Sequence, residues 1–317
     1  MKDNFIIRAI AGDNITGING TSSRDFYPIK WNFQDISYGP DENQKFALFI
    51  PKEKAVHAIV YIHGGAYLVG NKLEYPSFIS DFSGNNVIAS IDYRLINENS
   101  STCMDDILYD INSVLLKIKE IAIANGITIR DFVLIGHSAG GHIALLYAYK
   151  YNYEILKISA CVSLAGPADF SDDSGWSSMS MWGDNIETRL SFLSYMGSKL
   201  TGHSIVLTQP DWTKQANYQK FKKYIMEISP ITYVSRGGRI PPTLLVHGIR
   251  DNQVPYSNAV RLRDALNSTS IPHKLITNYF KANDHMLGGK VLTQINPILF
   301  RNQKWVIKAK KWIDNYM

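Results

Sequence analysis

The chain has 317 residues, of which 45% are hydrophobic and 19% are charged, and its formal net charge is +5. These values are typical of a globular protein with a substantial core, either one large α/β domain or two small ones. The basic residues are spread out, and their densest group, at residues 304–311, is interpreted as the solvated face of a helix, so nucleic acid is not an expected partner.

The number of cysteines and the lengths of the apolar runs indicate in which cellular compartment the protein is expected. Only Cys103 and Cys161 occur, so no disulfide framework is implied and a reducing, cytoplasmic location is expected. No run of eighteen apolar residues exists, so no membrane span is expected. The first residues also lack an apolar stretch as long as that of a signal peptide.

Strand-like and helix-like segments alternate along most of the chain. Strands are predicted over residues 35–39 and 45–51, joined by the turn sequence PDEN, and then over residues 55–65 and 86–95. The last of these is a nearly continuous apolar run, which is typical of a strand that is covered on both faces.

A long helix is predicted next, because apolar residues recur at helical spacing: Ile107, Ile111, Val114, Leu115 and Ile118. A capping box formed by Thr102 and Asp105 is expected to begin this helix. The segment FVLIGHSAGGHIALLYAY, over residues 132–149, then combines a short buried strand with a helix, and a further strand is predicted over residues 158–166.

One segment interrupts the alternation. Residues 170–233 contain no convincing strand and are too long for a simple loop, so an inserted helical cap is predicted. The segment is rich in aromatic residues and methionine: Trp176, Met179, Met181, Trp182, Phe192, Tyr195 and Met196. These side chains either fill the cap's own core or line an acyl pocket, and the sequence leaves both alternatives open.

Beyond this segment the alternation resumes, with a strand over residues 242–248, a helix over 256–267, a strand over 273–280 and a final helix over 305–316. Strict alternation implies a mostly parallel sheet, here of eight strands, with helices on both faces. The predicted organisation has three parts: an N-terminal extension (1–34), a core (35–169 and 234–317) and the inserted cap (170–233).

The motif Gly-His-Ser-Ala-Gly, at residues 136–140, lies between the strand and the helix of residues 132–149. A serine in such a tight turn is held in a strained, exposed position, which favours Ser138 as a nucleophile. Gly136 and Gly140 are required there, because a Cβ atom at either position would collide with the crossing backbone.

A nucleophilic serine needs a base, a group that orients the base, and donors for the oxyanion that forms. In sheets of this type, reactive groups gather on loops at the carboxyl ends of the strands. Asp251 follows the strand over residues 242–248, and His285 follows the strand over residues 273–280. The chain order Ser138, Asp251, His285 is the one that an α/β-hydrolase sheet imposes, so Asp251 is the predicted acid and His285 the predicted base.

Other residues compete for these two roles. Asp169 also follows a strand and is the alternative acid. His137 is expected to point away from the tip of the turn and His142 to lie within the helix, while His63 and His247 are expected to hold loops by hydrogen bonds. No catalytic role is expected for the remaining histidines: His57, His203 and His273.

Backbone amides are the expected donors to the oxyanion. One belongs to Ala139, the residue after the nucleophile, and the others lie in the glycine-rich loop HGGAYLVG, over residues 63–70. Two glycines let this backbone pass close to a substrate, and Gly65 and Ala66 are the predicted donors.

These motifs resemble those of the α/β-hydrolase esterases. The blocks HGGA, DYRL, GHSAGG, SPITYV and HGIRDNQVP are similar to that family's blocks in the same order, especially in its hormone-sensitive-lipase-like and small bacterial carboxylesterase branches. The segment ISYGPDENQKFALFIP is similar to the opening hairpin of the branch that contains feruloyl- and acetyl-esterase-like proteins and kynurenine-formamidase-like enzymes. The resemblance covers about residues 35–317 without the cap. It has two departures: Ala66 replaces a frequent third glycine, and DYRLINE replaces DYRLAPE.

The resemblance implies an α/β-hydrolase fold and a two-step acyl transfer. By motif, it assigns the nucleophile to Ser138, the acid to Asp251 and the base to His285, with oxyanion donors at Gly65, Ala66 and Ala139. The implied substrates are a small or medium carboxylic ester and water, and no metal or organic cofactor is required. Such chains often pair through an edge strand or the final helix, so a homodimer is a further expectation.

Three alternative functions are compatible with parts of the sequence. An amide-cleaving hydrolase, such as an arylformamidase, would use the same catalytic groups. A non-catalytic binding protein of this fold would normally lack a member of the triad, whereas all three candidates are present. A nucleotide-binding protein is indicated only by GAYLVGNK, in which Lys72 comes one place late and no Ser or Thr follows it.

Overall fold

The computed structural model describes residues 29–52, 55–152, 154–278, 284–287 and 304–317. Its centre is an eight-stranded sheet with the strand order β1-β2-β4-β3-β5-β6-β7-β8. The β1–β2 and β2–β4 pairs are antiparallel, and every other pair is parallel. The predicted eight-stranded, mostly parallel sheet is therefore confirmed.

The strands are β1 (Phe33–Ser37), β2 (Lys45–Phe49), β3 (His57–Ile62), β4 (Val87–Ile91), β5 (Asp131–His137), β6 (Ile158–Leu164), β7 (Thr243–Gly248) and β8 (His273–Asn278). β3, β4, β5 and β7 are buried along their whole length, as expected for strands covered on both faces. Residues 279–280, the end of the predicted last strand, and residues 1–28 of the predicted N-terminal extension lie outside the described residues.

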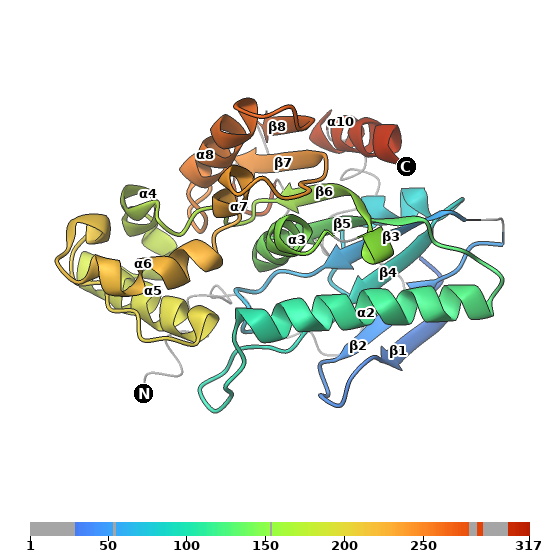
Figure 1. The fold of residues 1–317 in the computed structure, drawn as a ribbon, viewed down its shortest axis with the longest axis horizontal. Helices are drawn as coiled ribbons and strands as arrows, with labels where there is room; N and C mark the ends of the chain where they lie inside the picture. The colour runs from blue at the N-terminus through green and yellow to red at the C-terminus, as the bar shows by residue number, and fades with distance from the viewer. Residues whose placement is uncertain (1–28, 53–54, 153, 279–283, 288–303) are drawn as a thin grey trace.

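Helices cover both faces of the sheet (Figure 1). Those on one face are α2 (Met104–Ala124), α3 (Ala139–Lys150) and α8 (Tyr256–Asn267), and those on the other are the 3₁₀ helix η2 (Ser77–Phe82) and α10 (Lys304–Ile313). β3 contributes side chains to the core on both faces of the sheet, because its successive side chains point in opposite directions. Ala58, Val60 and Ile62 pack with α2 and α3, whereas Ile59 and Tyr61 pack with η2 and α10.

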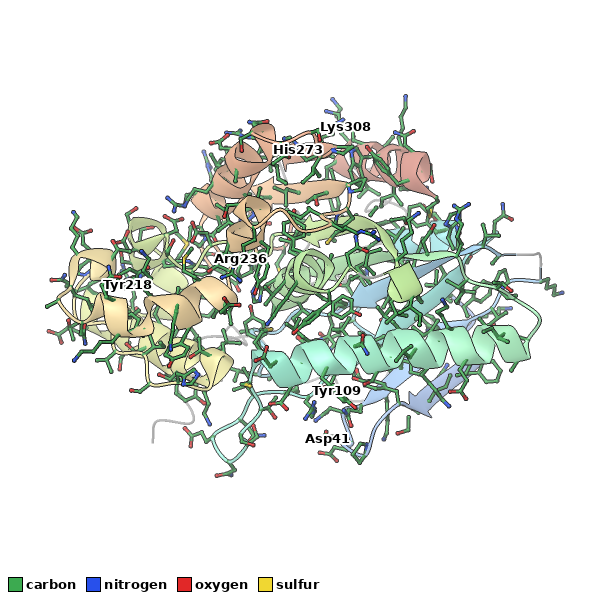
Figure 2. The ribbon with its side chains drawn as sticks, viewed as in Figure 1. Asp41, Tyr109, Tyr218, Arg236, His273 and Lys308 are labelled. Atoms are coloured by element: carbon green, nitrogen blue, oxygen red, sulfur yellow. The ribbon has the colours of Figure 1, made fainter. Side chains whose placement is uncertain are left out.

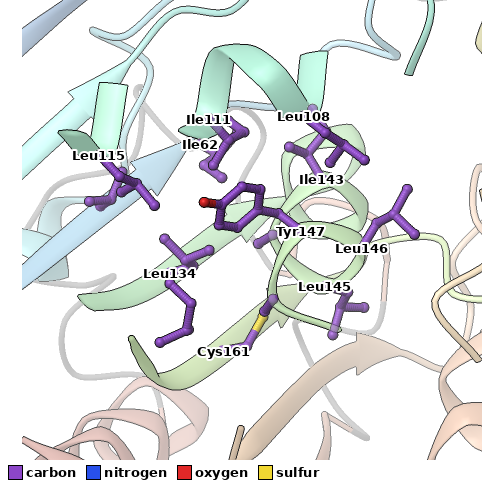
Figure 3. Close-up of a cluster of buried hydrophobic side chains, with 14 of the residues drawn as sticks. Ile62, Leu108, Ile111, Leu115, Leu134, Ile143, Leu145, Leu146, Tyr147 and Cys161 are labelled. Atoms are coloured by element: carbon purple, nitrogen blue, oxygen red, sulfur yellow. The ribbon is translucent and has the colours of Figure 1, made fainter. Parts of the chain in front are cut away.

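Helix α3 is held between α2 and the sheet. Figure 3 shows Tyr147 of α3 among Ile62, Ile111 and Leu134, which come from β3, α2 and β5. Tyr147 is fully buried, and its hydroxyl donates to Asn112 Oδ1 over 3.1 Å. The helix that follows the Gly-His-Ser-Ala-Gly motif is therefore fixed by close packing along its length.

The capping box of α2 lies one residue later than predicted. Cys103, in extended conformation, is the N-cap, and its backbone N–H donates to Asp106 Oδ2 over 3.0 Å. Thr102 and Asp105 do not form this box, so that prediction was wrong. Asp105 instead accepts a hydrogen bond from Lys150 Nζ of α3 over 3.1 Å. Two residue pairs with the required spacing overlap here, and the pair of Cys103 and Asp106 forms the box.

The segment between β6 and β7 is helical, as predicted. It contains α4 (Asp173–Ser177), η4 (Ser180–Trp182), α5 (Ile186–Thr201), η5 (Trp212–Lys214), α6 (Tyr218–Glu227) and α7 (Ile231–Ser235). Figure 1 shows α4, α5 and α6 gathered at one end of the sheet. These helices enclose an apolar cluster of their own, which includes Trp212 and Phe221, while Met196 and Leu200 of α5 pack in the main core.

The last helix turns its lysines to solvent. Lys304, Lys308 and Lys311 are exposed on α10, and Figure 2 shows Lys308 projecting outward. Lys310 Nζ instead contacts Asp81 Oδ2 over 2.6 Å. Among the described residues, no helix is both long enough and apolar enough to cross a lipid bilayer.

Candidate active site

Ser138 lies in the turn between β5 and α3, with φ 52° and ψ −121°. A positive φ is strained for a residue that has a Cβ atom. The turn is tight because Gly136 and Gly140 lack side chains: a Cβ atom at Gly136 would overlap the Gly140 carbonyl, and one at Gly140 would overlap the Ile62 carbonyl of β3. The predicted requirement for both glycines is confirmed.

The structure brings Ser138, Asp251 and His285 together. His285 Nδ1 donates to Asp251 Oδ2 over 2.8 Å, and the Ser138 hydroxyl donates to His285 Nε2 over 2.8 Å. A carboxylate can only accept hydrogen bonds, so Nδ1 carries a hydrogen, and in the neutral ring the lone pair of Nε2 then faces the serine. Asp251 and His285 are buried, whereas Ser138 is partly accessible.

Asp251 is held as an ionised carboxylate. Its burial opposes ionisation, but the charge and hydrogen bonds of His285 and His247 outweigh the burial and lower the pKa of Asp251. Its Oδ1 atom also accepts from the backbone N–H groups of Gln253 and Val254, each over 2.9 Å. The carboxylate is therefore fixed in position and charged, as a group that orients a histidine must be.

Asp169, the alternative acid, occupies a different environment. Its Oδ2 atom accepts from Arg261 Nε over 2.6 Å, and its Oδ1 atom accepts from the backbone N–H and the hydroxyl of Ser171. The Asp169 side chain is buried, whereas Arg261 is exposed. His285 is thus paired with Asp251, whereas Asp169 forms an ion pair with Arg261 of α8.

The loop after β3 comes close to Ser138, since a Cβ atom at Gly64 would lie 3.1 Å from Ser138 Cβ. Gly65 has φ 104° and Ala66 has φ 52°, in a turn whose first carbonyl, that of Gly65, accepts from Leu68 and Val69. Among the described residues, no group accepts from the N–H of Gly65, Ala66 or Ala139. These are the three predicted donors, and unpaired N–H groups beside a serine are suited to bind an oxyanion.

The sequence matches the BD-FAE family model over residues 47–266, which is well over half of the chain. The chain belongs to the BD-FAE family. The matched span contains Ser138 and Asp251 and ends before His285. No curated protein matches this sequence.

Solved structures share the fold of this BD-FAE protein. They include esterase B from Lactobacillus rhamnosis, a truncated carbohydrate esterase from gut microbiota, and the thermophilic esterase Est2 from Thermogutta terrifontis. Their TM-scores are 0.64, 0.60 and 0.57, at sequence identities of 16%, 18% and 17%. The alignments cover 89%, 92% and 89% of this chain, and 83%, 97% and 89% of the other chains. The likeness establishes the fold, and the predicted α/β-hydrolase fold is confirmed.

Two histidines support the site in ways that the sequence did not reveal. His137 Nε2 donates to the backbone carbonyl of His285 over 3.0 Å, and the two rings lie 5.1 Å apart. His247 Nε2 lies 3.2 Å from Asp251 Oδ2 and donates to the Val254 carbonyl over 3.1 Å. The sequence offers only local signals for these two residues. His137 directly precedes Ser138, and His247 lies four residues before Asp251.

The remaining histidines lie as expected. The loop-holding roles predicted for His63 and His247 are confirmed, since His63 Nδ1 donates to the Gly64 carbonyl over 2.7 Å. His57 bonds to Asp131 at the opposite edge of the sheet, and His273 Nδ1 donates to the Ile271 carbonyl. His203 stacks on Tyr224 within the insertion of the BD-FAE chain.

Several aromatic residues of the insertion serve its own packing. Trp176 is buried and stacks on Phe170, with ring centroids 5.4 Å apart. Trp182 is buried, stacks on Phe192 and donates its Nε1 hydrogen to the Gln253 carbonyl over 2.7 Å. For Trp176, which belongs to the insertion's apolar cluster, the structure favours the alternative in which the aromatic residues fill the cap.

Lys72 has partners that exclude the nucleotide-binding alternative for its loop. Its Nζ atom forms ion pairs with Asp35 over 2.8 Å and with Asp92 over 2.9 Å. The side chain is almost completely buried by these contacts. A lysine that binds phosphate must present its ammonium group to the ligand, and this one is engaged within the fold.

Proposed function

We propose that this BD-FAE protein is a serine carboxylesterase that hydrolyses small to medium carboxylic esters. The proposal rests on one observation above all, the hydrogen bonds that link Ser138 to His285 and His285 to Asp251, each over 2.8 Å. A hydroxyl bonded to a neutral imidazole that an ionised carboxylate orients is the arrangement that activates a serine. The similar structures named as esterases support an ester as the substrate class.

In the first step, Ser138 Oγ attacks the ester carbonyl carbon while its proton passes to His285 Nε2. Asp251 stabilises the imidazolium that results, without taking the proton itself. The carbonyl oxygen becomes an anion and accepts from the backbone N–H groups of Gly65, Ala66 and Ala139. The bond to the leaving oxygen then breaks, and that oxygen takes the proton from His285 and departs as an alcohol.

In the second step, water enters where the alcohol left. His285 Nε2 takes a proton from the water as its oxygen attacks the acyl carbon, and the same three amides bind the new oxyanion. The bond to Ser138 Oγ breaks, Oγ regains its proton from His285, and the carboxylic acid departs. This sequence consumes only an ester and water, so the proposal requires no metal or organic cofactor.

We also propose that residues 170–233 act as a cap on this site. Trp182 Nε1, in the insertion, donates to the carbonyl of Gln253, two residues after the proposed acid. The insertion therefore contacts the loop that carries Asp251. A cap so attached would contribute to the size of the acyl pocket.

The first experiment is to assay the protein on p-nitrophenyl esters from acetate to laurate, beside the Ser138→Ala variant. Hydrolysis that is fastest for short acyl chains and at least about 10³-fold slower in Ser138→Ala is the expected result, because the nucleophile is lost. Asp251→Asn should lower kcat by about 10⁴-fold, because the imidazole adopts the wrong tautomer. Asp169→Asn is the matched control and should keep most of the activity.

Two results would contradict the proposal. Hydrolysis that persists in Ser138→Ala would remove the serine from the reaction. Rapid loss of the formyl group from a formylated aromatic amine, with no turnover of any ester, would assign the same catalytic groups to amide cleavage.

A further inference from the structure

His142 lies in α3, four residues after Ser138, and is completely buried. Both of its ring nitrogens have partners. Nε2 lies 2.7 Å from the backbone carbonyl of Ile228, and Nδ1 lies 2.8 Å from the hydroxyl of Tyr67. One imidazole thus connects the nucleophile's helix with two segments that are remote in sequence.

The chemistry of these partners fixes the proton positions. A carbonyl oxygen can only accept, so His142 Nε2 carries a hydrogen and donates it to Ile228. Burial lowers the pKa of His142 to about 4, so the ring is neutral near pH 7 and Nδ1 keeps its lone pair. The Tyr67 hydroxyl therefore donates to Nδ1.

Tyr67 belongs to the loop that supplies the proposed oxyanion donors. It follows Ala66 directly, and both residues have positive φ, 52° for Ala66 and 65° for Tyr67. Two consecutive side-chain-bearing residues in this conformation are strained and persist only where surrounding contacts hold them. Tyr67 is held at two points, at its carbonyl by Ile96 N–H over 2.8 Å and at its hydroxyl by His142.

The other partner of His142 belongs to the insertion. Ile228 follows α6, and the next residue, Ser229, accepts a hydrogen bond at its hydroxyl from the N–H of Phe170 over 3.0 Å. The Phe170 ring stands edge-on to His142, with centroids 5.1 Å apart. The two ends of the insertion therefore meet beside this histidine.

We infer that Tyr67 and His142 are positioning residues that hold the oxyanion loop against the nucleophile's helix and connect that loop to the insertion. The inference rests on the proposed function, since it assigns the amides of Gly65 and Ala66 to the oxyanion. Neither side chain touches the reacting atoms. They act by keeping the loop amides where the oxyanion forms, a requirement that tolerates little displacement.

The decisive variant is Tyr67→Phe, which removes only the hydroxyl. Complete loss of an oxyanion donor lowers kcat by about 10²–10³-fold, so a loop that loses one of two anchors should lower kcat by about 10- to 100-fold, with KM changed less than about threefold. Affinity for a trifluoromethyl ketone, which forms an oxyanion on Ser138, should fall by the same factor as kcat/KM.

Tyr149→Phe is the matched control. Tyr149 lies on α3, as His142 does. It is buried, and its hydroxyl shares a hydrogen bond with Thr243 Oγ1 over 2.9 Å. Both variants lose one buried hydroxyl bond, so we expect similar decreases in Tm, whereas only Tyr67→Phe should affect kcat and the affinity for the ketone.

Variants of His142 test whether Tyr67 acts through this residue. His142→Leu removes both hydrogen bonds, and His142→Gln keeps a donor and an acceptor and should recover part of the activity. The double variant Tyr67→Phe/His142→Leu should be no slower than His142→Leu alone. If His142→Leu does not fold, the comparison of Tyr67→Phe with Tyr149→Phe decides the question.

Two outcomes would overturn the inference while leaving the proposed function intact: an unchanged kcat and ketone affinity in Tyr67→Phe, or losses that multiply independently in the double variant. A wild-type protein that hydrolyses no ester and is not labelled at Ser138 by a fluorophosphonate would instead overturn both. Labelling of the wild type thus separates failure of the inference from failure of the proposed function.

Discussion

At the residue scale, the proposed site is supported by histidines that stay neutral. His137 Nε2 donates to a carbonyl and His142 Nε2 donates to another, so each ring has a hydrogen at Nε2 and no need of a second proton. Burial, followed by the nearby charge of His285, lowers the pKa of His137 to about 3, and burial lowers that of His142 to about 4. Both rings therefore resist protonation in the folded protein.

This resistance predicts acid sensitivity of the fold. In the unfolded chain both histidines titrate near the ordinary value of 6.5, so the unfolded state binds more protons than the folded state between about pH 3 and pH 6.5. The free energy of unfolding should be highest above this range and fall as the pH falls through it. Between pH 7.5 and pH 5, each histidine should contribute a loss of about 2 kcal/mol.

Urea unfolding of the wild type and of His137→Gln at the two pH values measures this contribution. The variant lacks one of the titrating rings, so its stability should decline less on acidification, by about 2 kcal/mol. Equal declines in both proteins would show that His137 does not titrate as its burial requires.

The sequence revealed some of these residues and not others, for a physical reason. Ser138, Asp251 and His285 each follow a strand, and the carboxyl ends of parallel strands lie along one edge, so their proximity could be predicted. His137 bonds to a residue 148 positions away and His142 to one 75 positions away. No local pattern marks such pairs, because tertiary packing alone brings them together.

At the element scale, the site depends on the close approach of β3, β5 and α3. A Cβ atom at Gly136 would overlap the Gly140 carbonyl. One at Gly140 would overlap the carbonyls of Ile62, the last residue of β3, and of His63, which follows it. The obstacles are backbone atoms held by the sheet, so they cannot move aside as a flexible side chain would. The turn that presents Ser138 therefore requires the sheet and helix to pack at this separation.

Gly140→Ala should accordingly destabilise the fold by about 3 kcal/mol, the upper part of the usual range for overpacking. Gly84→Ala is the matched control, because its Cβ atom would meet no atom within 4 Å and its φ is not positive. Thermal unfolding of both variants gives the comparison. If their Tm values are equal, the packing at Gly140 is looser than the geometry implies.

Element boundaries show where sequence patterns lose precision. The buried strands were predictable because they are short apolar runs between turn signals, and both predicted strands around the insertion occur in the sheet. The start of α2 was predicted one residue early, since Thr102 and Cys103 both precede an aspartate by three residues. A capping box is a local pattern, and the spacing alone did not distinguish between the two overlapping copies of it.

At the scale of the whole molecule, both apolar packing and polar contacts attach the insertion to the core. Lys199, in the last turn of α5, donates from Nζ to the carbonyls of Asn97, Glu98 and Ser100 over 2.9, 3.1 and 3.2 Å. The insertion's apolar side chains are divided between a cluster of their own and the main core, to which α5 contributes Met196 and Leu200. This arrangement predicts that the insertion can open more easily than the sheet.

Homodimeric assembly and a cytoplasmic location stay predictions.

Lys199→Met should therefore increase amide hydrogen exchange in α5 by about three- to tenfold, or about 0.7–1.4 kcal/mol, because the Lys199 bonds are partly exposed and contribute less than the roughly 1.5–3 kcal/mol of a fully formed bond from a charged donor. Exchange in β5 and α3 should not change. Lys214→Met is the matched control, because in the described part of the chain Lys214 Nζ bonds only to Asp211 Oδ2, three residues away, over 3.0 Å. An unchanged α5 would mean that Lys199 does not anchor the insertion.

The insertion begins and ends at neighbouring points of the core. Ile231 N–H donates to the Ala168 carbonyl over 3.1 Å, so one hydrogen bond joins the segment that precedes the insertion to α7 at its end. A segment whose ends already meet can be exchanged for one of different length without stretching the strands that flank it. This BD-FAE protein is thus suited to chimeras in which a foreign cap replaces residues 170–227. Keeping Ile228 in place would preserve the carbonyl that His142 requires, so acyl preference could be redesigned separately from the chemistry at Ser138.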